Sequence, residues 1–176
     1  MLDRVSGLLT DLGESFNQLD LHSAAIQSVG VLIGSPTRDN CAMPFPIDAK
    51  WIAQTEAILG VRFPASFVTA MSSMNGGSVR TFVDEFELFP FLDSSDRKRI
   101  QRTCGSIDRE TASARKNAFG FPGSAIAIGA NGGGDLLILM PMPGHPEILQ
   151  HSVYWWDHET GEIQSVAADF SDLFKS

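Results

Sequence analysis

Hydrophobic residues near the start of the chain recur with the period of a helix. Apolar positions between residues 3 and 21 predict a helix there, weakened by two glycines. Residues 34–48 contain several prolines and few periodic apolar positions, which is typical of a loop or linker. We therefore expect residues 1–47 to form a helical extension and linker, and residues 48–176 to form the main domain.

Two more helices are predicted in close succession. An apolar stripe from Trp51 to Leu59 indicates the first, and Gly60 stands where a left-handed residue commonly ends a helix. Pro64 suits the first turn of the second helix, which stops at Asn75-Gly76-Gly77. The short connection between them predicts a helical hairpin with an apolar inner face.

Three shorter or more polar helices are predicted further along the chain. Ser94 or Ser95 is placed to cap a helix over 96–102. A helix over 106–117 has no strong apolar stripe, so we expect it to lie on the surface. Asp169 is placed to cap a final short helix.

Short apolar runs rich in β-branched and aromatic residues predict strands. These runs cover residues 78–83, 86–91, 124–129, 135–140, 153–156 and 162–167. The run Gly132-Gly133-Gly134 joins two of these strands, and Asp157 to Gly161 form the turn of a later hairpin. Pro141, Pro143 and Pro146 have no N–H to donate to a strand ladder, so we expect a loop around them.

The glycine run also resembles a phosphate-binding loop. Such a loop opens a helix whose N-terminal N–H groups meet the anion, whereas these glycines open a strand. No Lys-Ser or Lys-Thr pair follows them. A tight turn between strands accounts for the glycines, and Asp135 is expected to fix that turn through local hydrogen bonds.

Two groups of residues near the C-terminus carry candidate chemistry. Asp157, His158 and Glu159 are residue types that bind metals or transfer protons, but three consecutive residues rarely converge on one ion, so a solvated turn is favoured. Strand alternation sends Trp155 to one face and Tyr154 with Trp156 to the other, so one face is either an exposed aromatic patch or covered by a helix. No nucleophile–base pair is evident, and we predict no catalytic, metal-binding or cofactor-binding residue.

The charge of the chain is unevenly distributed. The chain has 176 residues, 43% of them hydrophobic, which suits one globular domain. Its net charge of −8 at pH 7 disfavours direct binding to nucleic-acid phosphates. Seven of the 13 Lys and Arg residues lie within 97–116, so the remainder is strongly acidic. That remainder either steers a basic partner or serves only to keep the protein soluble.

Cysteine usage and hydropathy favour a cytoplasmic protein. Cys41 and Cys104 lie far apart without metal-ligand spacing, which favours reduced thiols. The N-terminus lacks the apolar core of a signal peptide, and no stretch approaches the roughly 20 apolar residues that span a bilayer. We therefore expect no membrane partner.

Four motifs in order resemble the Smi/Knr-type family of the SUKH superfamily, named for yeast cell-wall assembly regulators. The motifs are Leu59-Gly60-Val61-Arg62-Phe63-Pro64, Asn75-Gly76-Gly77, the segment from Ile128 to Asp135, and the segment from Val153 to Gly161. The resemblance covers about residues 48–175. Residues 1–47 and the helical insert near 94–118 have no counterpart in the family pattern.

The resemblance implies an α+β fold with helices packed on a mixed, largely antiparallel sheet, and no enzymatic activity. Bacterial members typically act as immunity proteins that bind and neutralise polymorphic toxins, often nucleases. The leading expectation is therefore a non-enzymatic protein that binds a toxin domain. A general regulatory or scaffold module is the alternative. A small-molecule-binding protein or hydrolase is the third reading, and it requires a deep pocket near Asp135 and His158.

Two sets of residues are singled out by this reasoning. The residues expected to contact a protein partner are Asp84, Glu85, Glu87, Trp155, Asp157 and Glu159. The residues expected from the family pattern to be architectural are Gly60, Pro64, Gly76, Gly132, Asp135 and Gly161.

Overall fold

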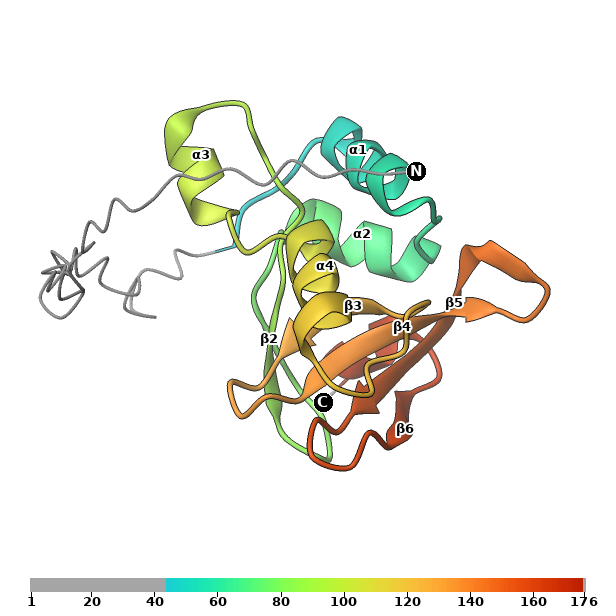
Figure 1. Ribbon diagram of the computed structural model, residues 1–176. Helices are drawn as coiled ribbons and strands as arrows, with labels where there is room; N and C mark the ends of the chain where they lie inside the picture. The colour runs from blue at the N-terminus through green and yellow to red at the C-terminus, as the bar shows by residue number, and fades with distance from the viewer. Residues whose placement is uncertain (1–43, 176) are drawn as a thin grey trace, which may run out of the picture. The chain divides into compact units, whose positions relative to one another are not determined.

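The computed structural model describes residues 44–175 (Figure 1). The helix predicted over residues 3–21 and most of the predicted linker lie outside the described residues. The boundary expected between residues 47 and 48 therefore stays a prediction.

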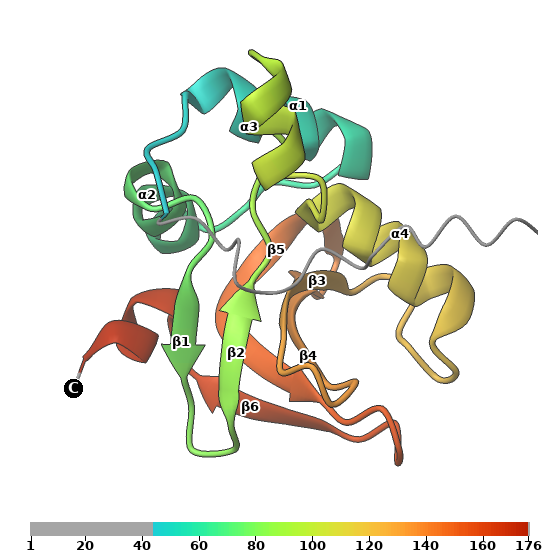
Figure 2. The same ribbon diagram turned by 90° about the vertical axis from the view of Figure 1, so that its left-hand side faces the viewer.

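Six strands form one antiparallel sheet. They are β1 (Ser78–Arg80), β2 (Glu85–Leu88), β3 (Ile126–Ala130), β4 (Leu136–Met142), β5 (His145–Trp156) and β6 (Ile163–Ala167). Their spatial order follows their sequence order, and each neighbouring pair is antiparallel. The sheet curls so that β1 and β2 run upright in front of β6, which lies almost crosswise behind them (Figure 2). The predicted α+β fold is confirmed, and the only parallel pairing among the described residues is an isolated bridge between Arg62 and Ile148.

Four α-helices and one 3₁₀ helix accompany the sheet in the described part of the chain. They are α1 (Ala49–Leu59), α2 (Ala65–Ser73), α3 (Arg97–Arg102), α4 (Ile107–Asn117) and η2 (Phe170–Phe174). Asp169 caps η2 as predicted, in a capping box with Asp172. The prediction that Ser94 or Ser95 caps α3 was wrong. The Asp96 carboxylate accepts the hydrogen bond from the Arg99 N–H at 2.9 Å, and Asp is as good a cap as Ser.

The helical hairpin of α1 and α2 ends in two chain-reversing segments. Gly60 ends α1 with a φ of 69°, a left-handed conformation that a glycine adopts without steric cost. Asn75 follows α2 and is buried. Its amide donates to the Phe91 carbonyl at 2.9 Å and accepts from the Phe91 N–H at 2.8 Å, as a neighbouring strand would. The Asn-Gly-Gly motif therefore both ends the helix and ties it to the chain after β2.

The main hydrophobic core lies where α1, α2 and η2 pack on the sheet. Phe67 on α2 is its centre, with ring centroids 4.7 Å from Phe170 and 5.9 Å from Phe91, both edge to face. All three rings are fully buried. Burial of one such side chain stabilises the fold by roughly 1.5–3 kcal/mol. These contacts join segments that are about 100 residues apart in sequence, from α2 to the C-terminal helix.

A smaller cluster forms around Trp156, where α4 covers part of the sheet. Trp156 is buried with Ile138, and its ring meets Phe121 edge to face at 5.3 Å. Trp155 points the other way and packs, half-buried, against the main core. The alternation predicted for the aromatic strand is therefore observed, with both faces at least partly covered.

The helix α4 is not confined to the surface as its weak apolar pattern predicted. Its residues Ile107, Thr111 and Ala114 lie on one side and are buried. The Thr111 hydroxyl accepts from the Ala127 N–H at 3.1 Å and donates to the Ala127 carbonyl at 3.4 Å. The buried side chains of Thr111 and Ala114 therefore lie on the packed side of α4. Both are too small or too polar to appear in the sequence as an apolar stripe.

The loop predicted around the three prolines was also wrong, because β4 and β5 continue through that region as a hairpin. Pro141 lies within β4 at a register irregularity, where a missing N–H is tolerated. Its carbonyl accepts a hydrogen bond from the Gln150 side chain at 2.7 Å. The hairpin reverses at Pro143-Gly144, where Gly144 has a φ of 80°. Figure 1 shows this hairpin projecting from the body of the domain.

Candidate functional site at the turn end of the sheet

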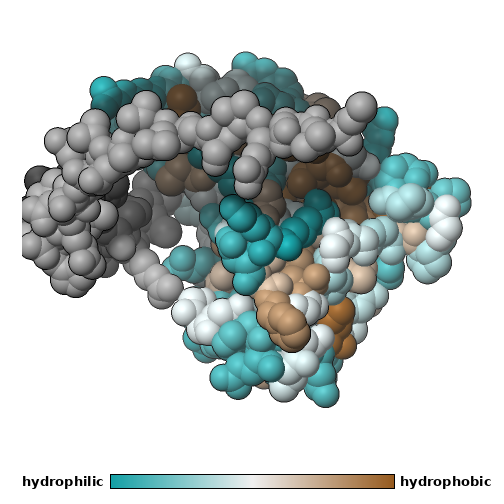
Figure 3. Space-filling model, in the orientation of Figure 1, coloured by the Kyte–Doolittle hydropathy of each residue, from teal (hydrophilic) through white to brown (hydrophobic). Residues whose placement is uncertain are grey.

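Three hairpin turns lie at the same end of the sheet, which we call the turn end. In an antiparallel sheet whose strands follow one another, alternate connections fall on the same side. The β1–β2, β3–β4 and β5–β6 turns therefore gather together, around residues 81–84, 131–135 and 157–162. The β1–β2 and β5–β6 turns both lie at the bottom of Figure 2, set apart from each other, and hydrophilic residues gather at the bottom of Figure 3.

Asn131 connects the first two of these turns. Its amide nitrogen donates to the Asp84 carboxylate at 3.0 Å and to the Asp135 carboxylate at 3.2 Å. Its amide oxygen accepts from the N–H groups of Gly133 and Asp135, at 2.9 and 3.2 Å. Asp135 was expected to fix the glycine turn through local hydrogen bonds, and it does accept one from Asn131. Asn131, however, takes part in most of the hydrogen bonds within this turn.

Asp135 connects the glycine turn to the β5–β6 turn. Its Oδ1 accepts from the backbone N–H of His158 at 3.1 Å and lies 2.8 Å from Nδ1 of the His158 ring. Burial alone would raise the pKa of Asp135, but the hydrogen bonds from His158 outweigh it and lower that pKa below 3.8. The same hydrogen bond to Asp135 raises the pKa of His158 above its usual 6.5. Each of the two residues therefore favours the charged form of the other.

The β5–β6 turn is stabilised by its first residue. Asp157 Oδ1 accepts from the N–H groups of Glu159 and Thr160, at 2.8 and 3.2 Å. Gly161 has a φ of 75° and donates its N–H to the Asp157 carbonyl at 2.8 Å. The side chain of Glu159 is left exposed at the tip of this turn.

The turn end gathers most of the residues expected to bind a partner. Asp84, Glu85, Asp157 and Glu159 all lie there, although Glu85 forms an exposed ion pair with Arg80 at 3.1 Å. Glu87 is exposed one step further along β2, and half-buried Trp155 offers only part of its ring. Their role in binding stays a prediction.

The structure adds carboxylates to this end that the sequence did not indicate as partner contacts. Glu162 is exposed after the β5–β6 turn, and Asp135, expected only to be architectural, adds a half-buried carboxylate. The link from Asn131 to Asp84 was missed because these two residues are 47 positions apart in the sequence. The signal that could have identified Asn131 is its place just before a glycine run, where Asn side chains commonly bond the backbone of a turn.

A metal ion would have to compete with this hydrogen-bond network. Ligand atoms of Asp135, Asp157 and His158 lie within 4.8 Å of one another. However, Asp135 Oδ1 and His158 Nδ1 already face each other at 2.8 Å, and Asp157 Oδ1 accepts two N–H groups. The arrangement therefore serves the turns and does not present an open set of ligands.

Ser66, His151 and Asp169 contain the residue types of a hydrolytic triad but not its arrangement. The Asp169 Oδ2 accepts from the Ser66 hydroxyl at 3.0 Å and lies 3.1 Å from His151 Nδ1. A triad needs the histidine between the nucleophile and the acid, and here the acid lies between the other two. Hydrogen bonds from Ser171 are the main cause that lowers the pKa of Asp169 to about 2. The group joins α2, β5 and η2 as a structural cluster.

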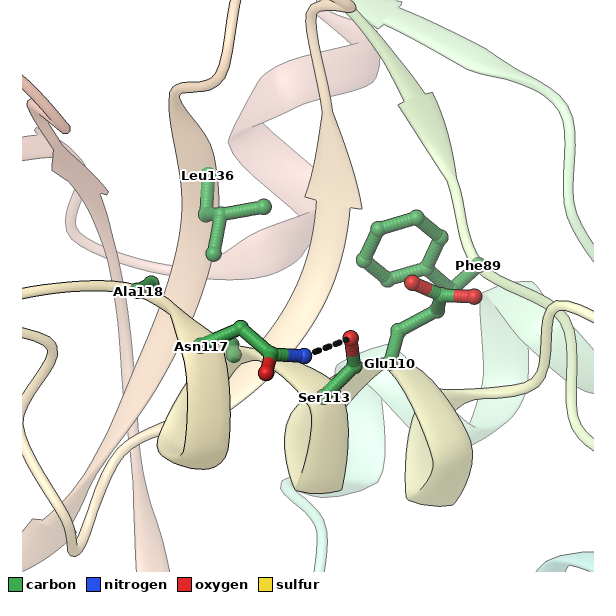
Figure 4. A pocket seen from close by; sticks show the side chains of 7 residues that line it. Phe89, Glu110, Ser113, Asn117, Ala118 and Leu136 are labelled. Carbon is green, nitrogen blue, oxygen red and sulfur yellow. Dashed lines mark hydrogen bonds between the residues drawn. The ribbon is translucent and has the colours of Figure 1, made fainter. Parts of the chain in front are cut away.

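Neither Asp135 nor His158 lines either of two hollows on the described surface. One, of about 240 Å³, lies between α4 and the sheet and is shown in Figure 4. It is lined by Phe89, Glu110, Ser113, Ala114, Asn117, Ala118 and Leu136. Its polar groups partly satisfy each other, since Asn117 donates to the Ser113 hydroxyl at 3.3 Å. The other, of about 370 Å³, lies beside α1, Arg62 and Glu147.

Comparison with known proteins identifies the family. No curated protein and no solved structure matches the chain. Among the described residues, no helix has the length and apolar character needed to cross a membrane. The family model described as SMI1 / KNR4 family (SUKH-1) matches residues 46–176, which is well over half of the chain. The chain therefore belongs to the SMI1 / KNR4 family (SUKH-1).

Proposed function

We propose that this protein is a non-enzymatic, cytoplasmic immunity protein that binds and neutralises a basic toxin domain through the turn end of its sheet. The observation that carries the proposal is the gathering of carboxylates from three separate turns at one end. Membership of the SMI1 / KNR4 family supports it, because bacterial relatives in the SUKH superfamily typically act as immunity proteins.

The turn end suits a cationic partner because its charges are both concentrated and held in place. The exposed carboxylates are Asp84, Glu85, Glu159 and Glu162, and the half-buried ones are Asp135 and Asp157. Hydrogen bonds from Asn131 and His158 hold two of them, so little side-chain conformational freedom is lost when a partner docks. Such complementarity raises the association rate and makes affinity fall steeply with salt.

A toxin with nuclease activity fits this surface. A nuclease binds phosphates with Lys and Arg side chains, and the carboxylates of the turn end offer an alternative set of anions to the same side chains. Binding there would block substrate without any chemistry by the immunity protein. A general regulatory module remains the alternative function, and it would bind several partners more weakly without protecting a cell.

Co-expression with the toxin domain encoded beside this gene tests the proposal. We expect the full chain to restore growth of cells that express the toxin domain, and the two purified proteins to form a complex that weakens as salt is raised. Failure to restore growth together with no complex at low salt would remove the immunity function.

A further inference from the structure

One edge of the sheet, the five-residue strand β6, is left open in the described structure. β6 is the last strand, and it pairs only with β5. Ile163, Gln164 and Ser165 are exposed along it, and only its last two residues are half-buried. An edge strand presents a row of unpaired N–H and C=O groups, which is a template for another strand.

The composition of β6 does little to discourage such pairing. Natural edge strands are commonly protected by Lys side chains, by Pro or by a very short length. β6 reads Ile-Gln-Ser-Val-Ala and contains no charged residue and no Pro. The opposite edge differs, because β1 has only three residues and ends in Arg80.

Charge favours a cationic strand over a second copy of this chain. Residues 157–174 contain no Lys or Arg, and the exposed carboxylates of Glu159 and Glu162 stand just before β6. After β6, Asp169 and Asp172 are already engaged, with His151 and with Lys175. Antiparallel pairing of two β6 strands would set the Glu162 end of each chain beside the Asp169 end of the other, where Lys175 is already paired with Asp172. The carboxylates before β6 would therefore gain no Lys or Arg partner, and each chain carries a net charge of −8.

We propose that β6 accepts an extended segment of a protein partner as a seventh strand, and that this segment carries Lys or Arg beside the turn end. Main-chain hydrogen bonds to β6 would supply affinity, and the carboxylates before β6 would fix the direction of the added strand. The inference rests on the proposed function, because it describes how the same acidic end meets its partner.

Two synthetic peptides of equal charge test the added strand. The first is an eight-residue peptide of alternating Lys and Val. The second has the same sequence with every other backbone nitrogen methylated, which blocks one hydrogen-bonding edge. We expect the first peptide to shift the amide NMR signals of residues 163–167 in the full chain and to slow their hydrogen exchange. The methylated peptide should bind at least about tenfold more weakly. Equal binding of the two peptides, shifts confined to the turns, or no binding of either would overturn the proposal.

A pair of matched variants places the site on the chain. Ser165→Lys puts a positive charge on the open edge, and Ser78→Lys puts the same charge on the exposed start of β1. We expect Ser165→Lys to weaken binding of the first peptide by about tenfold or more, and Ser78→Lys to change it by less than about twofold. Equal effects of the two variants would show that only net charge matters.

The toxin experiment separates the failure of this inference from the failure of the proposed function. If Ser165→Lys leaves toxin binding unchanged, the partner docks without adding a strand and the immunity function stands. If the peptides bind β6 as expected but the chain gives no protection from the toxin, strand addition stands and the immunity function fails.

Discussion

Asp135 contributes both to the candidate site and to the stability of the fold. One carboxylate receives hydrogen bonds from Asn131 in its own turn and from His158 in the next hairpin. It has little exposed area, with its side chain 16% accessible. A charged acceptor in this position stabilises the folded state and also orders two of the turns that we assign to partner binding.

Removal of this carboxylate should therefore cost stability. We expect Asp135→Ala to lower the free energy of unfolding by about 1 kcal/mol, because the Asn131 and His158 donors lose their acceptor. Glu159→Ala is the control, since that exposed side chain should change stability by less than about 0.5 kcal/mol. Urea denaturation measures both, and equal midpoints for Asp135→Ala and the wild type would contradict the assigned role.

The ring of His158 should report the same contact through its titration. Its pKa is raised by the hydrogen bond to Asp135, so protonated His158 favours the folded state. This contribution is fully present below pH 6.5 and is lost as the pH rises through the raised pKa. We expect an NMR titration to give a lower pKa for His158 in Asp135→Asn than in the wild type. The same pKa in both proteins would show that Asp135 does not hold the ring.

The sequence permits only part of this residue-scale picture to be predicted. That Asp135 belongs to a turn follows from its place after three glycines. Its contact with His158 does not, because the two residues are 23 positions apart and meet only after the strands have paired. Local patterns report hydrogen bonds within a turn and carry no information about bonds between turns.

At the scale of elements, α4 shows how a polar residue can anchor a helix. Its buried side consists of Ile107, Thr111 and Ala114, which have the i, i+4, i+7 spacing of a packed helix but little hydrophobic bulk. Pattern-based prediction weighs bulk, and so it placed this helix on the surface. The hairpin of β4 and β5 was missed for a related reason, because prolines break ladders in general but not at a bulge.

The buried hydroxyl of Thr111 should be needed for this packing. We expect Thr111→Val to lower the free energy of unfolding by about 1–3 kcal/mol, because the shape is kept while the buried Ala127 N–H loses its acceptor. Thr69→Val is a matched control, since Thr69 is exposed on α2 and bonds only to the Ala65 carbonyl. Thermal and urea unfolding of both variants gives the comparison. Equal losses would mean that the effect is one of helix propensity.

The glycine turn between β3 and β4 should tolerate a side chain at one position and not at another. Gly134 has a φ of 119°, and a Cβ there would lie 2.8 Å from the His158 ring. We expect Gly134→Ala to destabilise the protein by more than about 1 kcal/mol. Gly133→Ala should cost less, because its φ is not positive and the nearest atom to its Cβ is the Asn131 side chain at 3.3 Å. Equal stability of the two variants would contradict the close packing of the turns.

At the scale of the whole described domain, the main group of basic residues lies away from the turn end. Carboxylates gather at the turn end, while the basic residues of α3 and α4 belong to the connection between β2 and β3 at the other end of the sheet. Two of those basic residues are committed to structure. The guanidinium groups of Arg99 and Arg102 lie 3.8 and 4.5 Å from the ring centre of Phe45. The α+β fold and the family could be predicted from local motifs, but the gathering of the acidic turns depends on strand order.

The central claim is that the turn end binds a basic toxin domain. The affinity of that toxin domain for variants of this chain with neutralised carboxylates tests the claim most directly. The measurement is titration calorimetry of the purified toxin domain against the wild type, Glu159→Gln/Glu162→Gln at the turn end, and Asp48→Asn/Glu147→Gln elsewhere on the exposed surface. Both double variants remove the same charge. We predict that the dissociation constant rises by about tenfold or more in the turn-end variant and by less than about twofold in the other. Equal changes in the two variants, or a larger change in Asp48→Asn/Glu147→Gln, would contradict the account.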